Sequence, residues 1–146
     1  GMAAFYSALR GQPEDYKQLQ AALSGLDAMV PTADKAEEAQ VLGEFYLIMA
    51  QASHNIVLQH VMRSMKGMLI ENIQRNLQML AVNPEACNEI ALQRASIVAA
   101  IVQQNPQQAR RASNIHLAFI EETLLNINQR DSRVQRVLRR IETNPS

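Results

Sequence analysis

The chain has 146 residues, of which 47% are hydrophobic and 19% are charged, and five glycines and five prolines interrupt it. This composition provides enough apolar material for one compact domain and excludes disordered, fibrous and collagen-like proteins. Fourteen basic side chains balance fourteen acidic ones, giving a net charge of zero. No overall electric field therefore attracts the whole surface to nucleic acid or to an anionic membrane.

The single cysteine, Cys87, cannot form an internal disulfide and lacks the Cys and His companions of a zinc site, which suits a reducing compartment. No apolar run approaches the roughly 20 residues needed to span a bilayer, and no signal-peptide pattern opens the sequence. We therefore expect a cytoplasmic protein that does not contact a membrane. Gly1 precedes Met2 as a remnant of tag removal would, so we treat residues 2–146 as one domain.

Helix formers such as Ala, Leu, Gln, Glu, Arg and Met fill the stretches between glycine and proline. Asn83 and Asn105 each precede a proline and are expected N-caps, as is Asn55, while Pro13 opens a helix after Gln12. Thr32 and Asp131 are further expected caps. The predicted helices span residues 3–10, 13–28, 33–52, 56–80, 84–103, 106–129 and 132–141.

Apolar residues at helical spacing form stripes that each need a partner helix. They are Leu19, Leu23 and Leu26; Val41, Phe45, Ile48 and Ala52; and Ile90, Ile97 and Ile101. Short joints between long helices favour antiparallel neighbours, and no segment alternates for long enough to indicate a sheet. We predict an all-α antiparallel bundle of about six to seven helices.

Residues that could catalyse a reaction are few. The histidines at 54, 60 and 116 lie in segments without a nucleophile motif, and no glycine-rich phosphate loop or HExxH sequence occurs. The neighbouring glutamates at 37–38 and 121–122 fit solvated helix faces better than a catalytic carboxylate pair. We therefore do not expect an enzyme, a cofactor or a metal.

Two helical patterns have both a structural and a functional interpretation. Met62, Met65 and Met68 recur every three residues and could line an adaptable pocket, although packing in the core is the favoured interpretation. The last predicted helix carries arginines beside an apolar side, which could indicate a contact with nucleic acid. These are Arg130, Arg133, Arg136, Arg139 and Arg140. Stabilisation of the helix C-terminus is favoured, because no aromatic residue is interleaved to stack on bases.

Arg94 and Tyr46 lie inside apolar stretches of two different predicted helices, where an arginine without a partner would be costly. If Arg94 points inward, an anion should meet it. That anion could be an internal carboxylate such as Glu44 or Glu89, or the carboxylate of a ligand held by two hydrogen bonds. Alternatively, Arg94 could extend to the surface.

Several short motifs, in this order, resemble one family. Residues 44–58, EFYLIMAQASHNIVL, resemble the signature FHxxIAxASxNxxL of the FadR-type C-terminal (FCD) domain of GntR-family transcription regulators. Residues 93–101 and 109–117 resemble the helices EHxxIxxAI and AxxxMxxHL of that family, and residues 9–11 resemble its first turn. The resemblance extends from about Ala3 to Asn126.

This resemblance implies a helical bundle whose central pocket senses a small molecule, often a carboxylate such as lactate, pyruvate or glycolate. Many members hold a divalent metal with one Asp and three His, and the matching positions here are Leu42, Tyr46, Arg94 and His116. Only His116 is retained, and one imidazole does not hold a metal by itself. Arg94 would instead bind an acidic effector directly, with Tyr46 and His116 as hydrogen-bonding partners.

The resemblance therefore predicts the effector-binding and dimerisation domain of a transcription regulator, a homodimer that binds a small carboxylate metabolite. DNA would be bound only through a winged helix-turn-helix domain that we do not expect within these residues. The alternative is a homo-oligomeric interaction module with a decayed pocket, no small ligand, and an internal partner for Arg94.

Overall fold

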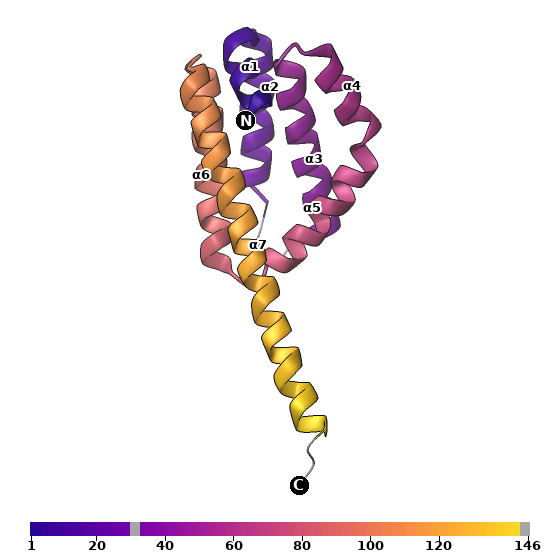
Figure 1. Ribbon diagram of the computed structural model, residues 1–146. Coiled ribbons are helices and arrows are strands. Elements are labelled where there is room, and N and C mark those ends of the chain that lie inside the picture. Colours follow the sequence, from indigo (N-terminus) through magenta and orange to yellow (C-terminus); the bar gives the residue numbers. More distant parts are fainter. Residues whose placement is uncertain (30–32, 144–146) are drawn as a thin grey trace.

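The computed structural model describes residues 1–29 and 33–143, and within them it contains seven α-helices and no strand (Figure 1). The helices are α1 (Met2–Arg10), α2 (Pro13–Asp27), α3 (Lys35–Ala52), α4 (Ile56–Ser64), α5 (Lys66–Leu80), α6 (Pro84–Val102) and α7 (Pro106–Thr143). The predicted all-α bundle is thereby confirmed. None of the described helices is both long and apolar enough to cross a membrane.

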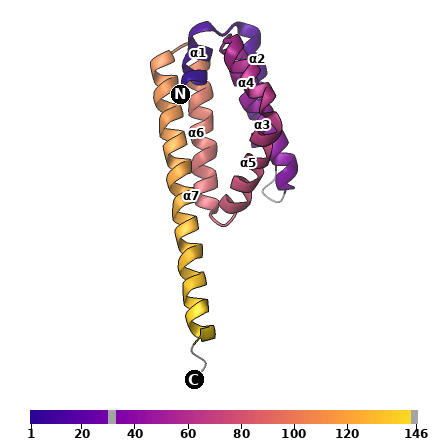
Figure 2. The ribbon, with the colours of Figure 1, turned by 45° about the vertical axis from the view of Figure 1, so that its right-hand side comes forward.

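The core forms where the apolar stripes of α2, α3 and α6 meet α1, α5 and α7. Leu19 on α2, Phe45 on α3 and Ile101 on α6 are fully buried. α3 packs against α1, α2 and α5, while α6 packs along α7, as Figure 2 shows for that pair. Burying one large apolar side chain contributes roughly 1.5–3 kcal/mol, so these three helices determine the fold.

The predicted caps on Asn55, Asn83 and Asn105 are confirmed. Each amide oxygen accepts a backbone N–H three residues ahead at 3.1 Å, which satisfies a donor that the first helical turn leaves free. Gln12 forms a capping box with Asp15 ahead of Pro13. Thr32 lies outside the described residues, and the cap of α3 is Asp34, whose carboxylate accepts from Ala36 N at 3.0 Å.

Two predicted helix boundaries are wrong. The segment 56–80 is interrupted at Met65, whose φ of −99° and ψ of 8° separate α4 from α5. Just before it, the Ser64 hydroxyl donates to the backbone oxygen of His60 at 2.8 Å, a contact that bends helices. Conversely, Asp131 lies inside α7 and caps no helix. A residue that favours caps does not stop a helix when good helix formers continue on both sides.

The favoured core interpretation of the methionine row is also wrong for two of its members. Met65 and Met68 are 49% and 67% exposed, respectively, because this side of α4 and α5 faces away from the bundle. Their spacing is helical, but spacing alone does not tell which face of a helix is covered.

The C-terminal part of α7 projects beyond the bundle (Figures 1 and 2). Every residue from 128 to 143 is exposed. This segment, residues 128–143, is called the α7 extension below. Its exposed apolar residues are Val134, Val137, Leu138 and Ile141. They recur at helical spacing and continue the side of α7 that buries Ile127.

Candidate functional site

The three predicted effector-binding residues come from three helices: Tyr46 from α3, Arg94 from α6 and His116 from α7. His116 is only 3% exposed, and Tyr46 and Arg94 are partly buried. Burial lowers the pKa of the His116 imidazole to about 4, and the positive charge of Arg94 adds to the decrease. Burial raises the pKa of the Tyr46 hydroxyl, and the charge of Arg94 opposes part of that increase. Arg94 thus acts electrostatically on both other residues.

Arg94 has no anionic partner among the described residues. Its Nε is fully buried without a hydrogen-bond acceptor, and no described carboxylate forms an ion pair with its guanidinium. The two internal candidates have other contacts: Glu44 pairs with Lys66, and Glu89 accepts a hydrogen bond from Gln93. A buried donor without an acceptor costs about 1–3 kcal/mol, so Arg94 Nε has an unmet need for a hydrogen-bond acceptor.

His116 is held by a residue that the sequence analysis did not single out. Its Nδ1 lies 3.0 Å from Oε1 of Gln93, and Nε2 of Gln93 in turn donates to Oε1 of Glu89 at 3.2 Å. Gln93 directly precedes Arg94, so it stands where the family motif EHxxIxxAI has its glutamate. This position in the motif, and Glu89 one helical turn earlier, were the sequence features that could have indicated a role for Gln93.

The four positions that hold a metal in many family members do not fit one here. Leu42 is buried and has no donor atom, and a guanidinium remains protonated at any ordinary pH. His116 offers one imidazole, and one imidazole does not hold a metal by itself. Among the described residues, no group of three or more His, Cys, Asp or Glu is arranged to hold a metal ion. Of these four side chains, only Arg94 carries a fixed charge, and that charge is positive.

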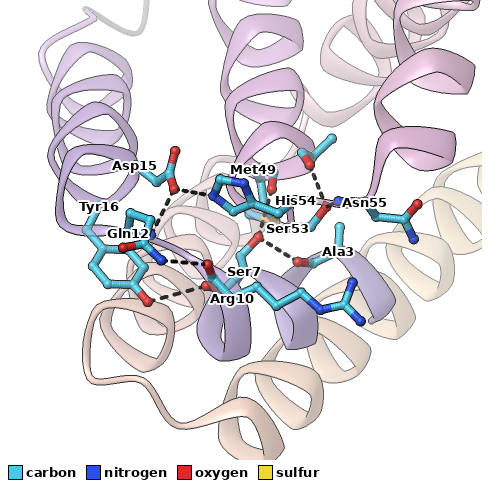
Figure 3. A network of polar contacts seen from close by, with 11 residues as sticks. Ala3, Ser7, Arg10, Gln12, Asp15, Tyr16, Met49, Ser53, His54 and Asn55 are labelled. Atoms are coloured by element: carbon cyan, nitrogen blue, oxygen red, sulfur yellow. Dashed lines mark hydrogen bonds and ion pairs between the residues drawn. The ribbon is translucent and has the colours of Figure 1, made fainter.

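A second cluster of polar contacts joins α1, α2 and α3 (Figure 3). The buried hydroxyl of Ser7 on α1 lies 2.7 Å from the backbone oxygen of Met49 on α3. Tyr16 on α2 donates to the backbone oxygen of Ser7 at 3.4 Å. Nε2 of His54 lies 2.7 Å from Oδ2 of Asp15. These contacts connect the helices, and the carboxylate of Asp15 has His54 as its partner.

The residues of the motif ASxN lie in this cluster and shape the turn from α3 to α4. Ser53 is fully buried and accepts a hydrogen bond from the backbone N–H of Asn55 at 3.3 Å. His54 adopts a φ of 52°, a left-handed conformation uncommon for a side-chain-bearing residue, and its contact with Asp15 supports it. The most recognisable part of the sequence therefore determines structure rather than chemistry.

An open cleft of about 460 Å³ lies between α6 and α7, and its lining includes Glu89, Phe119 and Ile127. Glu89 accepts a hydrogen bond from Gln93, the partner of His116, but Tyr46, Arg94 and His116 themselves do not line this cleft.

A family model of the FCD domain matches residues 1–119. The chain belongs to the FCD domain family. The resemblance inferred from the motifs is thereby confirmed, and the chain is an FCD domain of the kind found in GntR-family transcription regulators. The family points away from an enzyme.

Two curated relatives from Escherichia coli K12 are similar to this FCD domain. One is named "Putative L-lactate dehydrogenase operon regulatory protein" and is 29% identical over 136 residues, covering 93% of this chain and 51% of the relative. The other, "Glc operon transcriptional activator", is 31% identical over 91 residues, covering 62% of this chain and 36% of the relative. The chain thus spans about half or less of the length of these relatives.

Proposed function

We propose that this FCD domain senses a small organic acid bound between α3, α6 and α7. Arg94 contacts the carboxylate directly, and Tyr46 and His116 add hydrogen bonds. The observation that carries the proposal is the partly buried Arg94 without an anionic partner among the described residues, with its Nε buried and unsatisfied. A carboxylate accepts two parallel N–H bonds from a guanidinium, which is the strongest pairing available to that group. The name of one relative refers to an L-lactate dehydrogenase operon, which fits an acid as ligand.

Binding would act through a shift between conformations. An acid held by side chains from three helices stabilises the arrangement in which those helices converge, and the regulator attached to this domain follows that preference. We propose that residues 2–146 form one sensing unit and that the unit works as a homodimer. No metal is required, because the positive charge of Arg94 replaces that of the cation.

A thermal unfolding series tests the proposal. Lactate, pyruvate, glycolate, gluconate and acetate are each titrated in the presence of EDTA. A ligand at about 100 times its Kd stabilises by about 2.7 kcal/mol, which raises the midpoint of a domain of this size by roughly 5–10 °C. The shift should persist in Arg111→Met, a control at an exposed arginine of α7, and disappear in Arg94→Met. A shift that survives in Arg94→Met, or that appears only with added zinc or nickel, would overturn the proposal.

The α7 extension favours a second candidate function, a homo-oligomeric interaction module without a small ligand. Its apolar stripe at Val134, Val137, Leu138 and Ile141 is exposed in the single chain, and such a stripe is typical of a helix with a partner. Under this alternative, light scattering shows self-association and none of the acids shifts the unfolding midpoint. Self-association through the α7 extension is also compatible with ligand sensing, because Tyr46, Arg94 and His116 all lie outside residues 128–143.

A further inference from the structure

We propose that the α7 extension of one chain lies in the cleft between α6 and α7 of a second copy, and that the extension of the second copy lies in the same cleft of the first. This inference rests on the self-association proposed above and adds to it the surface that receives the extension. It is independent of any acid, because neither surface includes Tyr46, Arg94 or His116.

The receiving surface is a groove at the end of the bundle where α6 begins. Two open clefts, of about 460 and 590 Å³, share the lining residues Asn83, Glu85, Ile127 and Arg130 and therefore adjoin each other. Together they are called the α6–α7 groove below. Val82, which is 73% exposed, and Phe119 also line it. The groove thus offers apolar surface to an incoming segment.

One face of α7 continues from this groove to the end of the extension. Its apolar and small members are Phe119, Thr123 and Ile127 in the groove, and Val134, Val137 and Ile141 on the extension. With Arg130 between the two sets, successive members are three or four residues apart, which places them on one side of the helix.

This face is symmetric about Arg130. Phe119 and Ile141 each lie eleven residues from Arg130, and Thr123 and Val137 each lie seven. A twofold dimer requires a surface that complements itself, so that residue i contacts residue j of the second copy and residue j contacts residue i. Two α7 helices placed antiparallel across Arg130 meet this requirement, with the groove half of each facing the extension of the other.

The groove and the extension cannot meet within one chain. Thr123 and Val137 are fourteen residues apart on a continuous helix, about 21 Å at a rise of about 1.5 Å per residue. The extension therefore points away from its own groove (Figures 1 and 2). Helices gain most of their stability from packing of an amphipathic face, and every residue of the extension lacks that packing in the single chain. The geometry thus calls for a second chain.

The charges of the two surfaces are complementary. The charged residues that line the groove are three carboxylates and one arginine, namely Glu85, Glu89, Asp131 and Arg130. After Asp131, the extension carries four arginines and one glutamate, namely Arg133, Arg136, Arg139, Arg140 and Glu142. None of these four arginines forms an ion pair among the described residues. At the midpoint the two copies of Arg130 approach each other, and Glu85, which lines both clefts with Arg130, offsets their charge.

Two of the arginines are placed to reach the carboxylates on α6. Arg133 and Arg140 lie four and three residues from Val137 and therefore flank the apolar face. Arg139 is two residues from Val137 and points away from that face. A nucleic acid would contact the arginines but leave the apolar face uncovered, so a second copy of this chain fits the surface better.

Sedimentation equilibrium of the whole chain tests the charge complementarity. Arg133→Glu with Arg140→Glu should weaken the dimer roughly tenfold or more, because like charges then face each other, and Glu85→Lys with Glu89→Lys should do the same. Combining all four substitutions restores opposite charges and should recover most of the wild-type affinity. The matched control is Arg111→Glu with Arg139→Glu, which changes the net charge as much as the first pair but lies away from the face and should have little effect.

Engineered disulfides test the antiparallel arrangement. In a Cys87→Ser background, Thr123→Cys with Val137→Cys should give a covalent dimer on mild oxidation. A disulfide within one chain is excluded, because the two positions are about 21 Å apart and the bond needs Cα atoms within about 7 Å. Leu125→Cys with Val137→Cys is the control and should stay monomeric, since Leu125 lies on another side of α7. Crosslinking of Val137→Cys alone would show that two extensions pair in parallel and would overturn the proposal.

The outcomes separate this inference from the self-association on which it rests. If the wild-type chain is monomeric at every concentration measured, the homodimer proposal fails and the groove fails with it. If a dimer forms and is unaffected by Glu85→Lys with Glu89→Lys, the homodimer stands and the groove is refuted as its interface. Loss of the dimer in both charge-reversed pairs, with recovery in the combined variant, supports the groove.

Discussion

Replacing Arg94 with methionine should stabilise the ligand-free domain. Methionine has a similar length and nearly the same helix propensity, and it fills irregular apolar gaps. The substitution removes the buried Nε–H that has no acceptor, a group of the kind that costs about 1–3 kcal/mol. Because Arg94 is only partly buried, its outer nitrogens retain some hydration, and we expect the lower end of that range, about 1 kcal/mol. For a domain of this size, this corresponds to an increase in the unfolding midpoint of about 2–4 °C.

The assay is urea and thermal unfolding of wild type, Arg94→Met and Arg111→Met without added acid. Arg111→Met controls for the exchange of arginine for methionine on an exposed helix surface and should change the midpoint little. Arg94→Met should also raise the pKa of His116 towards its usual range, since the charge that helps to lower it is gone. A loss of stability in Arg94→Met with a neutral Arg111→Met would refute the reasoning, because it would show that Arg94 already has a favourable partner inside the fold.

Three further changes test other parts of the structure. Between pH 6.5 and 4, the unfolded imidazole of His116 binds a proton that the folded imidazole does not bind. The free energy of unfolding of the wild-type domain should therefore fall by about 3 kcal/mol more than that of His116→Gln over this range. Equal pH slopes of the two proteins in urea unfolding would contradict this. Asn55→Ala should lower the free energy of unfolding by about 1 kcal/mol, because it removes the cap of α4. Asp131→Ala, inside α7, should change it almost not at all. Similar losses in both variants would mean that Asp131 starts a helix of its own. Truncation after Gln129 should reduce self-association in light scattering and leave the lactate-induced midpoint shift intact, whereas loss of that shift would place the α7 extension in the binding site.

The sequence predicted most of the fold because the signals for it are local. The Asn-Pro pairs at 83–84 and 105–106 start α6 and α7 through a side-chain cap and a fixed φ, and neither depends on distant residues. The errors arose where a boundary depends on the balance between neighbours. At Met65, the helix breaks although the residue is neither proline nor glycine. Asp131 is of a residue type that favours N-caps, but the helix continues through it without a break.

The candidate site was less accessible to sequence reasoning. The resemblance indicated Tyr46, Arg94 and His116, but whether Arg94 has an internal partner depends on contacts between helices. Glu44, an expected partner on α3, pairs with Lys66 instead. The contact of Gln93 with His116 was indicated only indirectly, by the place of Gln93 in the motif, because an amide becomes informative only when both of its neighbours are known in space.

The motif that identifies the family and the residues proposed to bind the ligand have different roles, the first structural and the second functional. Ser53, His54 and Asn55 form a turn that any member with the same joint between α3 and α4 needs, so they predict the bundle and little about the effector. Of the positions that depart from the family, Leu42, Tyr46 and Arg94, only Arg94 is charged, and its charge acts on both Tyr46 and His116. Under the proposed function, Arg94 attracts the anion in place of a metal ion. Hence the response of this domain to an acid should be insensitive to EDTA, whereas a family member with the complete set of metal ligands should lose its response.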